Sequence, residues 1–194
     1  KFYLELDRLS KSYDFSFASA SILFEGTNKH FSNYARYFIK DTKPFKIKKK
    51  DHNLILGSAL IFRYDLIHSN FRFDEDLGLG AEFGGSEETD IFLTICEHNF
   101  KCMYFPSLKI YHPKIYDGQY NFKQMFSYGK GRGYTYKKHL SKNFYFYLFS
   151  FFSSITINFI LALLFLFNLN KLKSFNHFAL LLGKLYGFNS VVRY

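Results

Sequence analysis

The residues with the clearest chemical potential are the acids of "GGSEETDIFLTI", residues 84–95. Glu87, Glu88 and Asp90 lie at the start of an apolar run whose spacing predicts a helix, with Ser86 as a favourable N-cap. Carboxylates in the first turn stabilise a helix by about 0.3 to 1 kcal/mol each. A carboxylate fixed at such a helix start, beside a glycine-rich loop that leaves room for substrate, also suits a general base. The residues alone allow both interpretations.

Three other segments accompany this helix in a fixed order. "GSALIFR" (57–63) and "FDEDLGLG" (73–80) precede it, and "YFPSLKIYHP" (104–113) follows it. This succession resembles the C-terminal half of the catalytic domain of family 2 glycosyltransferases, which have the GT-A fold. The resemblance rests on residues 57–113 and extends more loosely over 1–140. It implies inverting transfer of a sugar from a nucleotide-sugar donor to a surface glycan or a lipid-linked acceptor.

The resemblance gives Glu88 the role of catalytic base, at a position where the family usually has Asp. The longer side chain is therefore a departure from the commonest pattern. The resemblance also implies an acceptor-binding set, namely Glu87, Asp90, Gly57, Ser58, Asp74 and Asp76. Each has a structural alternative: the glycine–serine pair can be an ordinary strand break, the two loop aspartates a solvated turn, and Asp90 a brace for its own helix.

Metal and diphosphate contacts are implied at three further positions. Family members use a histidine near His112 to contact the metal or the diphosphate, and an imidazole suits Mn(II) better than Mg(II). The main ligands of this Mn or Mg ion, an Asp-x-Asp motif, are expected outside this chain. Lys130 and Arg132 would bind the diphosphate or an anionic lipid. The alternatives are a structural histidine before Pro113 and a basic patch beside a membrane with no specific ligand.

The elements that must position these residues alternate between helix and strand. The spacing predicts a helix over 2–12, a strand within 15–26, and two strands around the break at 57–58. A short helix and a loop around Pro44 are expected within 27–51, and a strand or strand pair within 101–113. This alternation predicts an α/β fold, here a partial GT-A domain over residues 1–140.

Residues 141–194 form a second predicted domain, a membrane-associated helical tail. The stretch 144–167 carries no charged residue and is long enough to cross a bilayer with some tilt. Its Ser, Thr and Asn content leaves a buried or interfacial helix as the alternative. The last segment, 171–194, is predicted to be amphipathic and to lie at the membrane surface.

Composition narrows the classes of function. Aromatic residues make up 22% of the chain, which excludes a disordered tail, and the net charge is +10. No nucleic-acid-binding signature accompanies that charge, so we expect a membrane and phosphate-bearing substrates as partners rather than nucleic acid. Cys96 and Cys102 have no metal-type spacing and indicate reduced core thiols. Lysines are more frequent before 144–167 than after it, which predicts the cytoplasmic face of the inner membrane.

The nucleotide-binding β-α-β unit of the family is not visible in this sequence. The chain therefore resembles the distal part of such an enzyme, and we expect its nucleotide-binding half to precede it or to be a separate chain. The alternative to an enzyme is a non-catalytic, membrane-associated remnant or partner subunit of a glycosyltransferase.

Overall fold

The computed structural model describes residues 1–30, 43–67, 71–113 and 121–192. The chain forms two compact units: the first comprises Lys1–Phe73 and Glu88–Lys114, the second Asp74–Glu87 and Ile115–Tyr194. The first unit is a mixed α/β structure and the second is built from helices. The predicted α/β class and the hydrophobic C-terminal helix are thereby confirmed.

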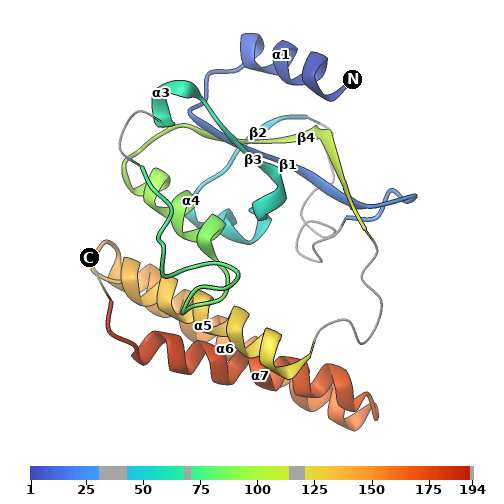
Figure 1. The fold of residues 1–194 in the computed structure, drawn as a ribbon, viewed down its shortest axis with the longest axis vertical. Coiled ribbons are helices and arrows are strands. Elements are labelled where there is room, and N and C mark those ends of the chain that lie inside the picture. Colours follow the sequence, from blue (N-terminus) through green and yellow to red (C-terminus); the bar gives the residue numbers. More distant parts are fainter. Residues whose placement is uncertain (31–42, 68–70, 114–120, 193–194) are drawn as a thin grey trace. The chain divides into compact units, whose positions relative to one another are not determined.

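A four-stranded mixed sheet organises the first unit (Figure 1). Its strands are β1 (Phe17–Phe24), β2 (Phe45–Lys46), β3 (Leu60–Phe62) and β4 (Cys102–His112), in the spatial order β2-β4-β1-β3. The central pair β1 and β4 is parallel, and both edge strands are antiparallel to their neighbours. β1 is buried along almost its whole length, as expected for a strand covered on both faces.

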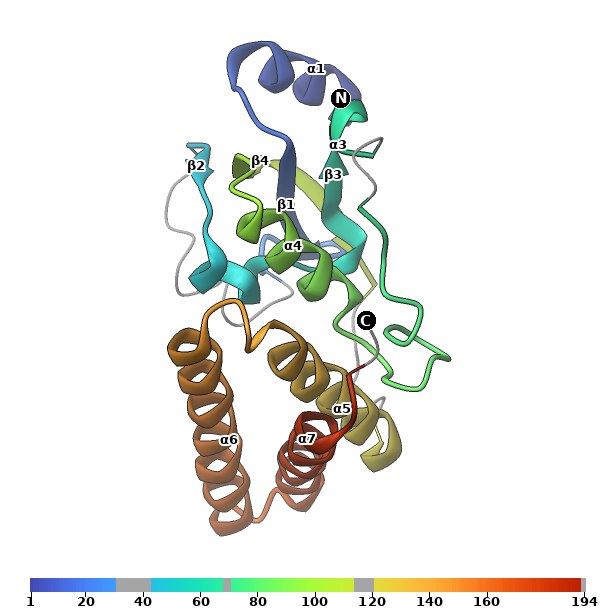
Figure 2. The same ribbon diagram turned by 90° about the vertical axis from the view of Figure 1, so that its left-hand side faces the viewer.

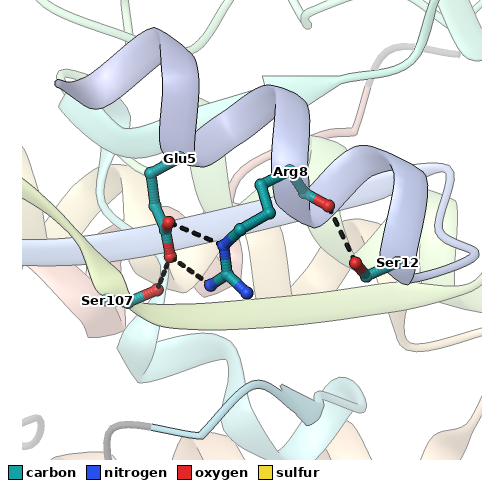
Figure 3. Close-up of polar contacts among 4 residues, drawn as sticks. All are labelled: Glu5, Arg8, Ser12 and Ser107. Atoms are coloured by element: carbon teal, nitrogen blue, oxygen red, sulfur yellow. Dashed lines mark hydrogen bonds and ion pairs between the residues drawn. The ribbon is translucent and has the colours of Figure 1, made fainter.

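Helix α1 (Phe2–Ser12) covers one face of this sheet, as its spacing predicts. Leu9 is fully buried in a cluster with Ala18 and Ala20 of β1 and Phe105 of β4. Polar contacts also tie the helix to β4, because Ser107 Oγ donates a hydrogen bond of 3.0 Å to the Glu5 carboxylate (Figure 3). The same carboxylate accepts two hydrogen bonds from Arg8, at 2.6 and 2.9 Å, and Ser12 Oγ donates to the Arg8 carbonyl one turn later.

Helix α4 (Glu87–Glu97) packs on the opposite face. Phe92 lies 5.5 Å from Phe17 of β1 between ring centroids, and Ile91, Leu93 and Ile95 are buried as well. The predicted helix after "GGS" is confirmed. It is buried nearly all round after its first turn, so its acids are held on a rigid, central element.

The prediction of a strand immediately before Gly57 is wrong. A 3-10 helix, η1 (Lys49–Leu54), occupies that position, followed by η2 (Gly57–Ala59), β3 and the short helix α3 (Tyr64–Ile67). Asp51 Oδ2 accepts from the Lys48 backbone N–H at 2.9 Å, and His52 Nδ1 lies 2.9 Å from the Lys49 carbonyl. These local side-chain hydrogen bonds satisfy backbone groups that a strand would need for its ladder. The short helix expected within 27–51 falls largely on residues 31–42, outside the described residues.

The second unit contains three long helices (Figure 2): α5 (Phe122–His139), α6 (Phe144–Phe167) and α7 (Lys171–Asn189). Each begins at an asparagine whose side chain accepts a backbone N–H three residues later. By its packing α5 belongs with this unit, although the predicted domain boundary at 140 follows composition and would place it with the sheet.

Helices α5 and α7 approach each other through glycines. Gly129 and Gly133 on α5 face Gly183 and Gly187 on α7, four residues apart in each helix. A Cβ at Gly133 would lie 2.1 Å from the Lys184 carbonyl oxygen, and one at Gly187 would lie 2.0 Å from the Lys130 carbonyl oxygen. Along these contacts the residue numbers increase in the same direction on both helices, so α5 and α7 run parallel. Paired small residues of this kind let two backbones touch.

Helix α6 runs antiparallel to α7. Lys184 Nζ donates to Ser154 Oγ near one end of α7, and Ser174 Oγ donates to the Ala162 carbonyl at 2.8 Å near the other. Among the described residues α6 is the one helix long and apolar enough to cross a membrane, by length and composition.

Candidate functional site

The predicted site residues fall into both compact units. The first unit holds Gly57, Ser58, Glu88, Asp90 and His112; the second holds Asp74, Asp76, Glu87, Lys130 and Arg132.

The backbone just before the acids of α4 is in a rare conformation. Gly85 has φ +131° and Ser86 has φ +74°, and both residues are buried. A non-glycine residue in the left-handed region costs on the order of 1 to 3 kcal/mol and persists only where its surroundings impose it. Ser86 therefore lacks the extended backbone of an N-cap, which our prediction gave it. Strain of this kind is concentrated at binding and catalytic sites. Here the strained backbone directly precedes Glu87, the first residue of α4.

Glu87 carries a buried carboxylate oxygen. Its Oε2 is buried and has no hydrogen-bond partner within the described part of the chain. The carboxylate packs against the backbone of Gly78, which has φ +110° and whose Cβ would lie 3.7 Å from Oε2. A buried, unsatisfied carboxylate oxygen is costly, so this oxygen is a ready acceptor for a ligand hydroxyl.

Glu88 and Asp90 have different surroundings on α4. Glu88 is half-buried, whereas Asp90 is only 2% exposed. Residues two apart on a helix point in nearly opposite directions, so the two carboxylates cannot act on the same atom as a pair. The burial of Asp90 favours the bracing role over acceptor binding, and it leaves Glu88 as the more accessible carboxylate of the two.

Gly57, Ser58 and His112 lie in the first unit. The glycine and serine are exposed and open the 3-10 turn η2 that leads into β3. His112 is the last residue of β4 and half-buried, with Nδ1 2.9 Å from the Pro113 carbonyl oxygen. Within the described ranges, no three His, Cys, Asp or Glu side chains come together to hold a metal ion. A divalent metal at His112 would need further ligands from outside those ranges.

In the second unit, residues 74–87 form a loop held on α5. The Asp74 carboxylate accepts an ion pair from Lys138 of α5 at 2.6 Å, and the two side chains are 12% and 23% exposed. Its other oxygen accepts the Asp76 backbone N–H at 2.9 Å. Phe83 stacks on Tyr134 of α5 with 4.1 Å between ring centroids. Asp74 therefore anchors the loop, a role that the sequence did not indicate because its partner lies 64 positions away.

Lys130 and Arg132 lie two positions apart on α5 and face different surroundings. The Lys130 ammonium lies 5.5 Å from the Phe83 ring centroid and 5.3 Å from that of Tyr186, so it sits between two aromatic faces. The Nη1 atom of Arg132 is buried and has no hydrogen-bond partner among the described residues. The pair does not form one clamp for a diphosphate.

A pocket of about 400 Å³ lies at the other end of α4, beside the start of β4. Lysines dominate its polar lining: Lys46, Lys48, Lys49, Lys50 and Lys101. Cys96 and Cys102 also line it as free thiols, 3.8 Å apart. Their hydrogen bond and burial raise the pKa of Cys96, which keeps this thiol protonated. The sequence run "KIKKK" (46–50) indicates a basic segment here, but nothing in it indicates a cavity.

Comparison with known proteins gave no match: no family model, curated protein or solved structure is similar to this chain.

Proposed function

We propose that this chain is the acceptor-binding, base-bearing part of a membrane-associated glycosyltransferase. The observation that carries the proposal is the strained Gly85–Ser86 turn, which leads directly into two carboxylates at the start of a buried helix. Helix capping alone does not require a left-handed serine or a buried Glu87 oxygen with no hydrogen-bond partner in the described part of the chain. A site that accepts ligand hydroxyl groups accounts for both.

In the proposed reaction Glu88 removes the proton of an acceptor hydroxyl. The acceptor oxygen then forms a bond to the anomeric carbon, and the bond from that carbon to the donor's diphosphate breaks, with the electron pair leaving on the diphosphate. Glu87 orients the acceptor through its buried oxygen. A divalent Mn or Mg ion would stabilise the leaving diphosphate, with His112 as one ligand and the others outside this chain.

The sheet is consistent with a missing nucleotide-binding half. Within the described residues, β3 pairs on one side only, with β1, and its side chains are half-buried. A β-α-β unit from the same protein or from a separate chain could extend the sheet at this edge. By itself this chain is then expected to bind a nucleotide sugar poorly and to transfer no sugar.

The test uses the full-length protein, or this chain with its nucleotide-binding partner, in its native membranes. A panel of nucleotide sugars is supplied, and release of nucleoside diphosphate is measured with acceptor present. Glu88→Gln should reduce kcat about 10²- to 10⁴-fold, the usual contribution of a general base, and Glu88→Asp should retain part of it. Glu97→Gln, at the opposite end of α4, is the matched control. Unchanged turnover in Glu88→Gln excludes this residue as the base. Full activity of the isolated chain refutes the requirement for a further nucleotide-binding half.

The non-catalytic alternative makes a different prediction for the same panel. A partner subunit would stabilise a separate nucleotide-binding chain without supplying the base. Transfer would then require the presence of this chain but would be insensitive to Glu88→Gln.

A further inference from the structure

The outer face of α6 is apolar along its whole length. Its large exposed side chains include Tyr145, Phe149, Phe152, Phe159, Ile160, Leu163, Leu164 and Phe167. At 100° per residue these positions lie on one side of the helix, opposite the side that packs on α7. A continuous apolar stripe of this size on a 24-residue helix marks a surface that binds a protein or a membrane and is thereby shielded from water.

The charges around this stripe have one sign. From residue 118 to the C-terminus the sequence contains no Asp or Glu, and every charged residue is Lys or Arg. Lys142 lies two residues before the start of α6, Lys171 lies four residues after its end, and both are exposed. An apolar face flanked by cations, in a region without acids, is complementary to an anionic lipid leaflet.

Two orientations would satisfy α6 and its flanking lysines. If α6 crosses the bilayer, Lys142 and Lys171 lie in opposite headgroup layers. If α6 lies in the plane of one leaflet, with its outer face towards the acyl chains, both lysines lie in the same layer.

The packing of α5 and α7 decides between these orientations. Lys184 of α7 donates to Ser154, close to the middle of α6. The glycine contacts bring Lys130 of α5 beside Gly187, within one turn of Lys184. Helix α5 packs along α7 through these contacts, and its Lys123 and Arg132 lie within two turns of Lys130. A crossing α6 would carry these cations to the centre of the bilayer, where charged side chains are most costly.

We infer that α6 lies in the plane of one anionic leaflet, with its outer face in the lipid and α5 and α7 on the water side. The helix is then an interfacial anchor, and the turn at Leu169 stays on the same side of the membrane as the first residues of the chain. This inference rests on the membrane association in the proposed function but not on sugar transfer.

The test is side-specific labelling in sealed membrane vesicles of known orientation, using the full chain. Single cysteines are introduced as Leu169→Cys, at the α6–α7 turn, and as Tyr3→Cys, which reports the side of α1; both native residues are more than 80% exposed. The native cysteines are replaced by Cys96→Ala and Cys102→Ala. A membrane-impermeant maleimide should label both introduced cysteines from the same side. Labelling from opposite sides shows that α6 crosses and overturns the inference.

A second measurement tests the lipid without depending on those variants. The purified protein should float with phosphatidylglycerol-containing vesicles at least about tenfold more than with phosphatidylcholine vesicles, and added salt should reduce this preference. Phe159→Glu, on the outer face of α6, should abolish flotation, whereas Lys11→Gln on α1 should not change it. Equal flotation with both vesicles, or none with either, refutes an anionic leaflet as partner. Sugar transfer is not measured, so a catalytically silent Glu88 would leave these outcomes unaffected.

Discussion

The glycine contacts between α5 and α7 give the sharpest test of the helical unit. A Cβ at Gly133 would lie 2.1 Å from the Lys184 carbonyl oxygen, whereas ordinary contact begins at 3.4 Å. Gly133→Ala therefore requires the helices to separate by about 1.3 Å, because a backbone oxygen cannot rotate out of the way as a side chain can. Overpacking of this kind costs about 1 to 3 kcal/mol or more. Alanine recovers at most about 1 kcal/mol through its higher helix propensity.

We expect a net loss of about 2 kcal/mol in the free energy of unfolding for Gly133→Ala, and a similar loss for Gly187→Ala. The double variant should lose less than the sum, because one separation of the helices relieves both clashes. Gly57→Ala is the matched control, since no atom lies within 4 Å of its added Cβ and its φ is not positive.

The assay combines denaturant unfolding with amide hydrogen exchange of α7. Exchange in α7 should accelerate in both glycine variants and remain unchanged in the control. If Gly133→Ala and Gly187→Ala are as stable as Gly57→Ala, with α7 equally protected, the two helices are not in backbone contact and the membrane geometry inferred from that contact is lost.

Two further predictions concern charges in the same unit. Burial, with a smaller contribution from the Arg132 charge, lowers the pKa of Lys184 to about 7, from 10.5 in the unfolded chain. Between these two pKa values the unfolded chain binds more protons than the folded chain. The free energy of unfolding should therefore rise with pH from about 7 to 10, by at most about 1.4 kcal/mol per pH unit. Lys184→Met should flatten this rise, as measured by denaturant unfolding at a series of pH values. Lys138→Met should destabilise the protein by about 1 to 3 kcal/mol, because it leaves the nearly buried Asp74 carboxylate without its ion pair. The swap of Asp74→Lys with Lys138→Asp should restore part of that loss in a double-mutant cycle, and independent, additive effects would contradict the anchoring role.

The elements with strong periodicity were predictable from the sequence. α1, β1, α4 and β4 lie where the apolar spacing places them. The strand expected before Gly57 was wrong because Asp51 and His52 make local hydrogen bonds that no periodicity rule includes. Local polar side chains decide the backbone where the apolar signal is short.

The candidate site was predictable in its helix and not in its surroundings. The two glutamates fall at the start of α4 as expected, but the left-handed backbone of Ser86 has no signature in residue type. The ion pair that holds Asp74 joins residues far apart in the chain, and the aromatic neighbours of Lys130 come from a loop and from α7. Tertiary contacts of this kind cannot be read from local spacing.

Helix α5 is the long helix that the sequence did not predict, and the inferred membrane geometry depends on its packing. Its glycines at 129, 131 and 133 lower the helix propensity of the segment, which is why composition did not indicate a helix. At Gly129 and Gly133 the same absence of side chains lets α7 pack against α5, which brings Lys130 of α5 beside Gly187 of α7. At about 2.5 to 3.5 kcal/mol for each cation at a bilayer centre, carrying Lys123, Lys130 and Arg132 there would cost about 8 to 10 kcal/mol. That cost is comparable to the whole stability of a domain. In the inferred geometry, the glycines that lower the helix propensity of α5 would therefore hold α6 at the membrane surface rather than across it.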